Sequence, residues 1–189
     1  MHINSDKLRL TARRWPLLLL MLACHAGADE ALDAAFERDV LIIEASRFAC
    51  YRFDVWLAVD RPQQMRGLMH VREMPDTSGM LFIYDSADYR SMWMKNTFIA
   101  LDIAFARADG SIANIIANTE PQSLQSISST DAVMYVLELN AGTAGRLSID
   151  QNSRLLWGPA FAKGSGNDER GDPDSIVGLY KTAAIDSAR

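Results

Sequence analysis

The chain has 189 residues, of which 49% are hydrophobic, and a formal net charge of −5 at pH 7. This length and hydrophobic content predict one domain with a substantial core. The acidic balance excludes nucleic acid as a partner and opposes binding to anionic lipid, because both depend on dense lysine and arginine contacts.

Residues 1–28 are expected to be a signal peptide. A basic start that includes Lys7 and Arg14 precedes the apolar run 17–23, and Ala26-Gly27-Ala28 offers a cleavage site. The apolar run is shorter than the ~20 residues that span a membrane, so no transmembrane segment is expected in the mature chain. Taking four basic residues and one acid from the 19 and 24 in the chain leaves 15 and 23, a net charge of −8. We therefore expect a periplasmic or secreted protein.

The two cysteines suggest different roles. Cys24 follows Leu22-Ala23, which gives an alternative localisation: lipid-anchored to a membrane through Cys24. After cleavage at residue 28, Cys50 is the single remaining cysteine, so no internal disulfide is expected. Its neighbours are apolar and aromatic, and Cys50 is therefore interpreted as a small buried side chain rather than a nucleophile.

The elements can be taken in chain order. Residues 29–39 are polar and alanine-rich, which predicts a spacer or a frayed helix. Asp60 is expected to cap a helical turn over 61–66, which Gly67 ends. Residues 118–131 form a polar loop that contains Pro121. Apolar runs and two-residue alternation predict strands at 40–43, 53–59, 79–84, 92–105 (interrupted at 95–97), 112–116, 133–139 and 155–157.

These elements predict a domain over residues 40–158 that is mainly β. We expect a compact β-sandwich or barrel-like (jelly-roll-like) domain with one or two short helices. Residues 159–189 belong to a segment rich in glycine, proline, aspartate and serine that has no apolar period until 176–185. This composition predicts a flexible tail with a short C-terminal helix.

Five motifs follow one another in a fixed order along the predicted domain. They are Arg66-Gly67-Leu68-Met69, Gly79-Met80-Leu81-Phe82, Trp93-Met94-Lys95-Asn96-Thr97, Leu101-Asp102-Ile103 and Val136-Leu137-Glu138-Leu139-Asn140-Ala141-Gly142. In these motifs the chain resembles the family known as domain of unknown function 192. The resemblance covers about residues 40–157 and implies a small β-rich fold with short helices packed on it. It implies no established activity.

Several classes of catalytic site are excluded by residue count. His70 is the one histidine of the predicted mature chain, whereas a cupin-like metal site needs several. A serine triad would also have to use His70, and no Gly-x-Ser-x-Gly elbow is present. The chain has neither a phosphate-binding loop nor a dinucleotide fingerprint. A Cys50–His70 pair requires that the fold join these two residues. No metal site and no cofactor are predicted.

Six methionines fall within a 30-residue window. Thioethers are soft ligands for Cu(I), which an exported protein could meet. Methionine also fills irregular gaps in cores, and here it stands beside Leu68, Leu81 and Phe82, so core packing is the favoured interpretation. The six residues are Met65, Met69, Met74, Met80, Met92 and Met94.

A set of polar residues within the motifs forms the main candidate site. On a sheet with one solvated face, alternation places Asp102 and Glu138 outward. If a second layer covers that face, the acids lie in a cleft and need cationic partners. A desolvated Glu138 has a raised pKa and suits a general acid, with Lys95 stabilising negative charge. The predicted binding residues are Arg66, Trp93, Lys95, Asn96, Asp102, Glu138 and Asn140.

The leading hypothesis is an exported envelope protein that binds a small ligand or an envelope protein in a cleft lined by these residues. The sequence leaves open whether the protein is an enzyme. One alternative is an acid–base enzyme acting on an envelope carbohydrate or peptide, with Glu138 and Lys95 as catalytic candidates. Another is a periplasmic metal-handling protein that uses the methionines.

Overall fold

The structure, a computed structural model, describes residues 27–46 and 49–157 of the chain. Cys24, nearly all of the predicted signal peptide and the predicted C-terminal tail lie outside the described residues. Within the described residues, no helix is both long enough and apolar enough to cross a membrane.

The described part of the chain contains short helices and strands in the order α1-β1-β2-α2-β3-β4-β5-β6-β7-β8-α3-β9. The helices are α1 (Gly27–Asp33), α2 (Arg61–Arg66) and α3 (Thr143–Leu147). The strands are β1 (Glu37–Ser46), β2 (Ala49–Ala58), β3 (Ser78–Asp88), β4 (Ser91–Met92), β5 (Leu101–Ala106), β6 (Ile112–Ile116), β7 (Ile127–Ser128), β8 (Val133–Asn140) and β9 (Arg154–Leu156).

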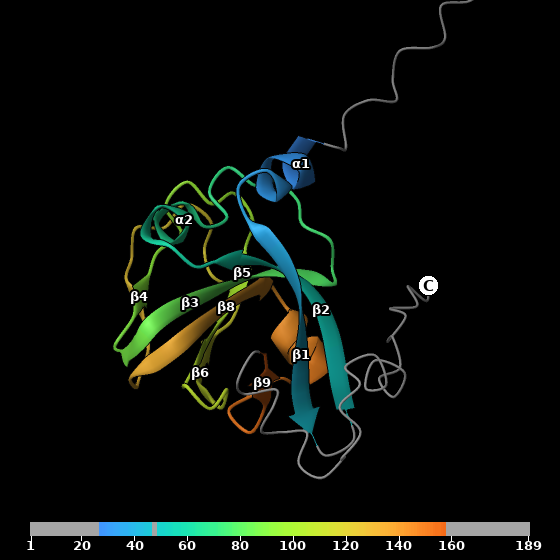
Figure 1. Cartoon of the computed structure of the whole chain (residues 1–189), viewed down its shortest axis with the longest axis vertical. Helices are drawn as coiled ribbons and strands as arrows, with labels where there is room; N and C mark the ends of the chain where they lie inside the picture. The colour runs from blue at the N-terminus through green and yellow to red at the C-terminus, as the bar shows by residue number, and fades with distance from the viewer. Residues whose placement is uncertain (1–26, 47–48, 158–189) are drawn as a thin grey trace, which may run out of the picture.

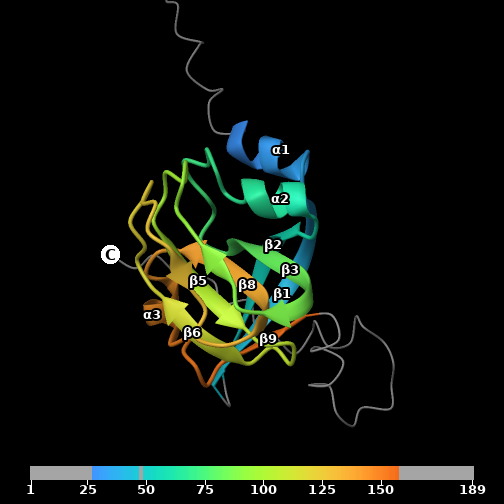
Figure 2. The same ribbon diagram turned by 90° about the vertical axis from the view of Figure 1, so that its left-hand side faces the viewer.

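One seven-stranded sheet organises the domain, in the order β6-β5-β8-β3-β2-β1-β9 (Figure 1). Its neighbouring strands are antiparallel except β2 and β3, which run parallel. The two edges approach each other, because Ser111 bridges to Arg154 and the Leu155 amide donates to the Gly110 carbonyl at 2.8 Å. The sheet therefore curls into a half-barrel (Figure 2). The prediction of a mainly β, barrel-like domain is confirmed.

Both faces of this sheet are buried. All seven strands contribute to an inner core inside the curl, with residues such as Leu41, Phe53, Leu81, Ala104, Ile112, Leu137 and Leu155. The outer face carries a second core. In it, residues from the helices and loops that cover this face pack against strand residues: Leu32, Phe36, Leu68, Val71, Met74 and Met94 against Trp56, Met80, Phe82 and Ile103. The half-solvated β2 strand expected from its alternation is therefore covered on both sides: Val55 and Trp56 are both fully buried.

The N-terminal segment, for which a spacer or a frayed helix was expected, forms helix α1 and packs on the outer face of the sheet. Leu32 and Phe36 are buried in the outer core. The Trp56 indole donates to Asp33 Oδ1 at 2.7 Å, and Arg38 stacks over the same indole at 4.8 Å. The polar, alanine-rich composition hid this role, because two apolar residues one helical turn apart suffice to dock a short helix. The first strand accordingly begins at Glu37 rather than Val40.

Helix α2 forms as its sequence predicts. Asp60 accepts from the Gln63 amide while Gln63 Oε1 accepts from the Asp60 amide, which completes a capping box. The helix has no fully buried residue, and polar side chains hold it in place instead. Gln63 donates to the Ala35 carbonyl and Gln64 to the Ile83 carbonyl. α1 and α2 thus lie side by side at one end of the sheet (Figures 1 and 2).

Three short helices are present in the described residues, where one or two were expected. The additional helix α3 contains a glycine and has a left-handed N-cap, Gly142, with no side-chain cap of its own. The polar loop 118–131 also contains β7, which pairs with β4 in a separate two-stranded sheet. Neither α3 nor β7 has an apolar period in its sequence. Each is stabilised by hydrogen bonds to other parts of the chain, so neither could be predicted locally.

Gly79 allows β3 to approach β8 closely. A Cβ atom at this position would lie 2.7 Å from the Glu138 carbonyl oxygen and 2.8 Å from Leu139 Cδ2. We expect Gly79→Ala to lower the free energy of unfolding by roughly 1–3 kcal/mol, the usual range for overpacking. Urea denaturation measures this change. Gly145→Ala is the matched control, because nothing lies within 4 Å of its Cβ position, and a wild-type midpoint for Gly79→Ala would contradict the prediction.

Candidate ligand-binding site

A pocket of about 550 Å³ lies on the outer face of the sheet, beside α2. Its walls come from α2 and the turn after it, from β3, β4 and β8, and from the segments 93–97 and 124–126. The charged lining residues are Arg61, Arg66, Arg90, Lys95 and Glu138. The apolar and thioether lining residues include Met65, Leu68, Phe82, Met92, Trp93 and Leu124. We call this cavity the Glu138 pocket.

Glu138 is the buried acid of the pocket. It lies in β8, opposite Met80 of β3 and Ile103 of β5, and is only 4% exposed. Its Oε2 atom has no hydrogen-bond partner among the described residues. Burial raises the pKa of Glu138 to about 8, because an apolar environment disfavours the charged form. The carboxyl group is therefore protonated at neutral pH and able to donate a hydrogen bond.

Tyr84 and Arg90 form a second polar group in the same pocket. The Arg90 guanidinium stacks on the Tyr84 ring at 4.0 Å and donates through Nη2 to the Ser86 carbonyl at 2.7 Å. Its Nε atom is buried and lacks a partner within the described residues. Burial raises the pKa of Tyr84, an effect that Arg90 opposes and Glu138 reinforces. Tyr84 is thus close enough to both charged groups to respond to them.

A tight turn presents Trp93 and Lys95 to the pocket. The Lys95 ammonium lies 5.2 Å from the Trp93 ring centroid. The turn is closed by the Thr97 amide, which donates to the Met94 carbonyl, and Asn96 takes a positive φ of 57°, a conformation that asparagine tolerates better than most residues. Trp93 remains 44% exposed, so much of its ring is accessible from solvent.

Asp102 lies on the other face of the sheet. It pairs in register with Leu139, whereas Glu138 pairs with Ile103, so the two acids point to opposite sides. Asp102 is 2% exposed and accepts backbone hydrogen bonds from Asn118, Gly142 and Ala144 at 2.8, 3.1 and 2.8 Å. The expectation that alternation places both acids outward on one face is corrected: both faces are covered, and Asp102 fastens two loops and the start of α3.

Of the seven predicted binding residues, four line the Glu138 pocket: Arg66, Trp93, Lys95 and Glu138. Asp102, Asn96 and Asn140 do not line it. Asn140 donates to the Met74 carbonyl at 2.8 Å and so ties the end of β8 to the loop before β3. The Asn96 amide points to Met69 Sδ at 3.9 Å. Sequence reasoning missed Tyr84, the last residue of the apolar run predicted at 79–84, and Arg90, which follows β3. Neither residue belongs to one of the five motifs.

The six methionines divide between core and pocket. Met74, Met80 and Met94 are buried in the outer core. Met65, Met69 and Met92 line the Glu138 pocket, where Met92 Sδ accepts from the Tyr84 hydroxyl at 3.9 Å. The same pocket is lined by four cationic residues, which oppose the entry of a metal cation. Core packing and a soft pocket wall account for this methionine-rich window.

Two other places in the described residues do not have the features of a binding or catalytic site. A hollow of about 610 Å³ beside α1 is lined by residues 33–38 and Gln63, and none of these carries an unpartnered buried polar atom. Cys50 lies near the start of β2 and pairs with Glu44 of β1, whereas the His70 amide donates to the Asn96 carbonyl and its ring packs edge-on against Phe98, so the structure records no Cys50–His70 pair among the described residues. Burial and Glu44 raise the pKa of the Cys50 thiol, which disfavours the reactive thiolate.

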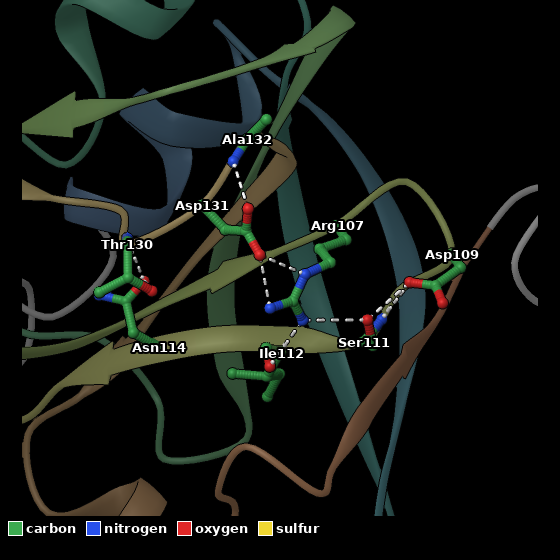
Figure 3. Close-up of polar contacts among 8 residues, drawn as sticks. All are labelled: Arg107, Asp109, Ser111, Ile112, Asn114, Thr130, Asp131 and Ala132. Carbon is green, nitrogen blue, oxygen red and sulfur yellow. Dashed lines mark hydrogen bonds and ion pairs between the residues drawn. The ribbon is translucent and has the colours of Figure 1, made fainter.

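A polar network around Arg107 is fully paired. Arg107 donates to Asp131 through Nε at 2.8 Å and also reaches the Ser111 hydroxyl and the Ile112 carbonyl (Figure 3). Through Asp131 this network ties the β5–β6 hairpin to the chain that enters β8. Hydrogen bonding and the charge of Arg107 lower the pKa of Asp131. The network contributes no residue to the Glu138 pocket and is interpreted as structural.

Comparison with known proteins places the chain in an uncharacterised group. The model of domain of unknown function 192, described as "Uncharacterized ACR", matches residues 42–157, more than half of the chain. The resemblance in the five motifs is thereby confirmed. Among curated proteins none matches this chain.

Two solved structures are similar to this chain. A protein from Sinorhizobium meliloti described as a "putative transcription regulator" is 39% identical, with a TM-score of 0.62 over 64% of this chain and 93% of that one. A protein of unknown function from Novosphingobium aromaticivorans is 31% identical, with a TM-score of 0.63 over 65% of this chain and 86% of that one.

Proposed function

Since this protein belongs to the domain of unknown function 192 family, whose description assigns no activity, we propose that it is an exported protein that binds a small organic ligand in the Glu138 pocket. One observation carries the proposal. The described residues contain two buried side-chain polar atoms without a hydrogen-bond partner, Arg90 Nε and Glu138 Oε2, and both residues line this pocket. Leaving such atoms unpaired is costly, and a bound ligand would pair them.

The make-up of the pocket supports a small-molecule site. Ligand pockets are mostly 300–1,000 Å³ in volume and combine apolar walls with a few placed polar groups; this one measures about 550 Å³. Trp93, Leu124 and Met65 expose large apolar side chains at its rim. Elsewhere a lone exposed apolar residue needs no explanation, but three around one cavity favour an occupant.

The export part of the proposal rests on the sequence of residues 1–28. A basic start, a short apolar run and a small-residue cleavage site are typical of a signal peptide. Fractionation of cells that express the full chain tests this: the mature protein should appear in the periplasm or the medium. Recovery of the uncleaved chain from the cytoplasm would contradict export and leave the pocket proposal untouched. Palmitate labelling of Cys24 would indicate the lipid-anchored alternative.

Acid–base catalysis is the second candidate, and the pKa of Glu138 favours it. A carboxyl group with a pKa of about 8 exchanges protons near neutral pH, as a general acid must. Activity that depends on Glu138 would appear as turnover of an envelope carbohydrate or peptide, abolished in Glu138→Gln. The name of the Sinorhizobium relative suggests a third role, in transcription, but the net charge of −5 opposes contact with nucleic acid.

Trp93→Ala provides a direct test of the binding proposal. We expect any ligand found by a ¹H–¹⁵N NMR screen to shift the Trp93 indole signal, and the variant to bind it about tenfold more weakly, since a lost aromatic contact is worth on the order of 1 kcal/mol or more. The melting temperature should change little, because Trp93 is 44% exposed.

Tyr89→Ala is the matched control for this test. Tyr89 is an aromatic residue that is 69% exposed and does not line the pocket, so its removal should leave the affinity unchanged. Ligands whose shifts map to the hollow beside α1, with the Trp93 signal unmoved, would contradict the proposal.

A further inference from the structure

The geometry points to an organic carboxylate with an apolar body as the ligand of the Glu138 pocket. This inference rests on the proposed function and narrows it to one chemical class. It depends on three features of the pocket: its charge, its unpaired donors and its apolar wall.

The charge of the pocket is opposite to that of the protein. Four cationic residues line it, Arg61, Arg66, Arg90 and Lys95, against a single acid, Glu138. The Arg66 guanidinium donates to the Ala31 carbonyl and stacks on Phe36, neither of which lines the pocket, so Arg61, Arg90 and Lys95 are the cations that can face a ligand. The chain as a whole carries a net charge of −5. The ion pairs among the described residues involve Arg38, Arg52 and Arg107, so none of the four pocket cations is neutralised by a described carboxylate. An anion would find these charges uncompensated, whereas a cation would be repelled.

The buried unpaired atoms in the pocket are proton donors at neutral pH. Arg90 Nε carries a hydrogen and cannot accept. Glu138 is buried and meets no neutralising partner, which keeps its carboxyl group protonated, so that it presents a hydroxyl and no negative charge. Hydrogen bonds from such donors are strongest when the acceptor is ionised. The two oxygens of a carboxylate are acceptors only, and they match this pair of donors in kind.

The pocket wall calls for an apolar body attached to the anion. Trp93 and Leu124 stand at the rim, and Phe82 and Met92 line the interior. Lys95 lies over the Trp93 ring, so a cation and an aromatic face meet at the pocket mouth. A bare inorganic anion would satisfy the charges but leave the exposed apolar side chains in water. A carboxylate joined to a ring or a short alkyl chain would both pair with the charges and bury the exposed apolar side chains.

The test compares carboxylates with their uncharged amides. Titrations at neutral pH, followed by NMR on the full chain, would use phenylacetate with phenylacetamide and hexanoate with hexanamide, and acetate and inorganic phosphate as anions without an apolar body. We expect each apolar carboxylate to bind about tenfold more tightly than its amide, because hydrogen bonds to an ionised acceptor are roughly twice as strong as neutral ones and a tenfold change corresponds to about 1.4 kcal/mol. Acetate and phosphate should bind more weakly than either carboxylate.

Variants assign this preference to the pocket. Arg90→Gln should lower the ratio of carboxylate to amide affinity several-fold, by removing the charged donor. Arg72→Gln is the matched control, because Arg72 stacks on Phe98 at 4.8 Å outside the pocket, and it should leave the ratio unchanged.

Three results would overturn the inference. Amides that bind as tightly as carboxylates at the Trp93 signal would remove the anionic requirement while the binding proposal stands. Phosphate or acetate binding as tightly as phenylacetate would remove the apolar requirement. Absence of binding by every compound of this set would reject the carboxylate class, and only a screen of other chemical classes that also fails at this pocket would reject the proposed function.

Discussion

At pH 8 and above, Glu138→Gln is expected to stabilise the protein by roughly 3–5 kcal/mol in the free energy of unfolding. The reason is the burial that raises the pKa of Glu138 from 4.5 to about 8. Between these values the unfolded chain releases its proton while the folded chain keeps it, so folding takes up a proton and stability falls as the pH rises. The slope is about 1.4 kcal/mol per pH unit, and above pH 8 the loss is complete. Glutamine has nearly the same shape and carries no charge to desolvate.

Thermal melts across this pH range would measure the effect. The gap between Glu138→Gln and wild type should be largest at pH 8 and above and close progressively as the pH falls, disappearing below pH 4.5, where the wild-type carboxyl is protonated in both states. Glu120→Gln, at an exposed glutamate outside the pocket, is the control and should melt like wild type. A variant that melts well below wild type at pH 8 would show that Glu138 belongs to a structural network. Stabilisation on neutralising a residue is typical of functional positions.

The second large effect is expected at Asp102, in the opposite direction. Asp102→Ala should lower the free energy of unfolding by roughly 3–5 kcal/mol, because three backbone amides lose a charged acceptor in a buried place. These amides belong to Asn118, Gly142 and Ala144, so the loss acts on the loop after β6 and on the start of α3 together.

Urea denaturation measures this loss as a shift of the midpoint at constant slope. Asp76→Ala removes an exposed aspartate from the loop before β3 and serves as the control, with an expected change within about 0.5 kcal/mol. A decrease of less than about 1 kcal/mol in the free energy of unfolding of Asp102→Ala would contradict the prediction, because it would mean that water satisfies the three amides as well as the carboxylate does. Because Asp102 does not line the pocket, the Asp102→Ala variant should bind ligand as wild type does at a low temperature where it is still folded.

Much of the fold could be predicted because its signals are local. The capping box at Asp60 and the apolar strands of the sheet each depend on a few adjacent residues. Helix α3 could not be predicted, because the group that caps it is Asp102, which lies about 40 residues earlier in the chain and in another strand. Alternation also failed for Asp102 and Glu138. Alternation predicts that both residues point outward, whereas the strand register places them on opposite faces of the sheet. Alternation also does not show that both faces are buried, because that depends on the curl of the sheet and on the docking of α1 and α2.

The candidate site was predictable in part for the same reason. Trp93, Lys95 and Glu138 belong to family motifs, and polar residues within apolar strands are conspicuous. Arg90 and Tyr84 gave no such signal. Their significance depends on a stacking contact and on an unpaired Nε atom, which are properties of the packed structure. Asn140 and Asp102 show the converse: motif residues whose conspicuous polarity serves backbone hydrogen bonds.

The pairing of β1 with β9 has a consequence for how the chain folds. Ser153 donates to the Ala45 carbonyl across 108 residues of sequence, and Glu44 pairs with Arg154. During synthesis, at about 5–20 residues per second, the outer edge of β1 therefore stays unpaired until almost the whole domain has been made. Domains dominated by such distant contacts fold in roughly milliseconds to seconds. Until this last pairing forms, the open β1 edge exposes unpaired backbone amides and carbonyls, which makes it the surface of the incomplete sheet most prone to pair with another chain.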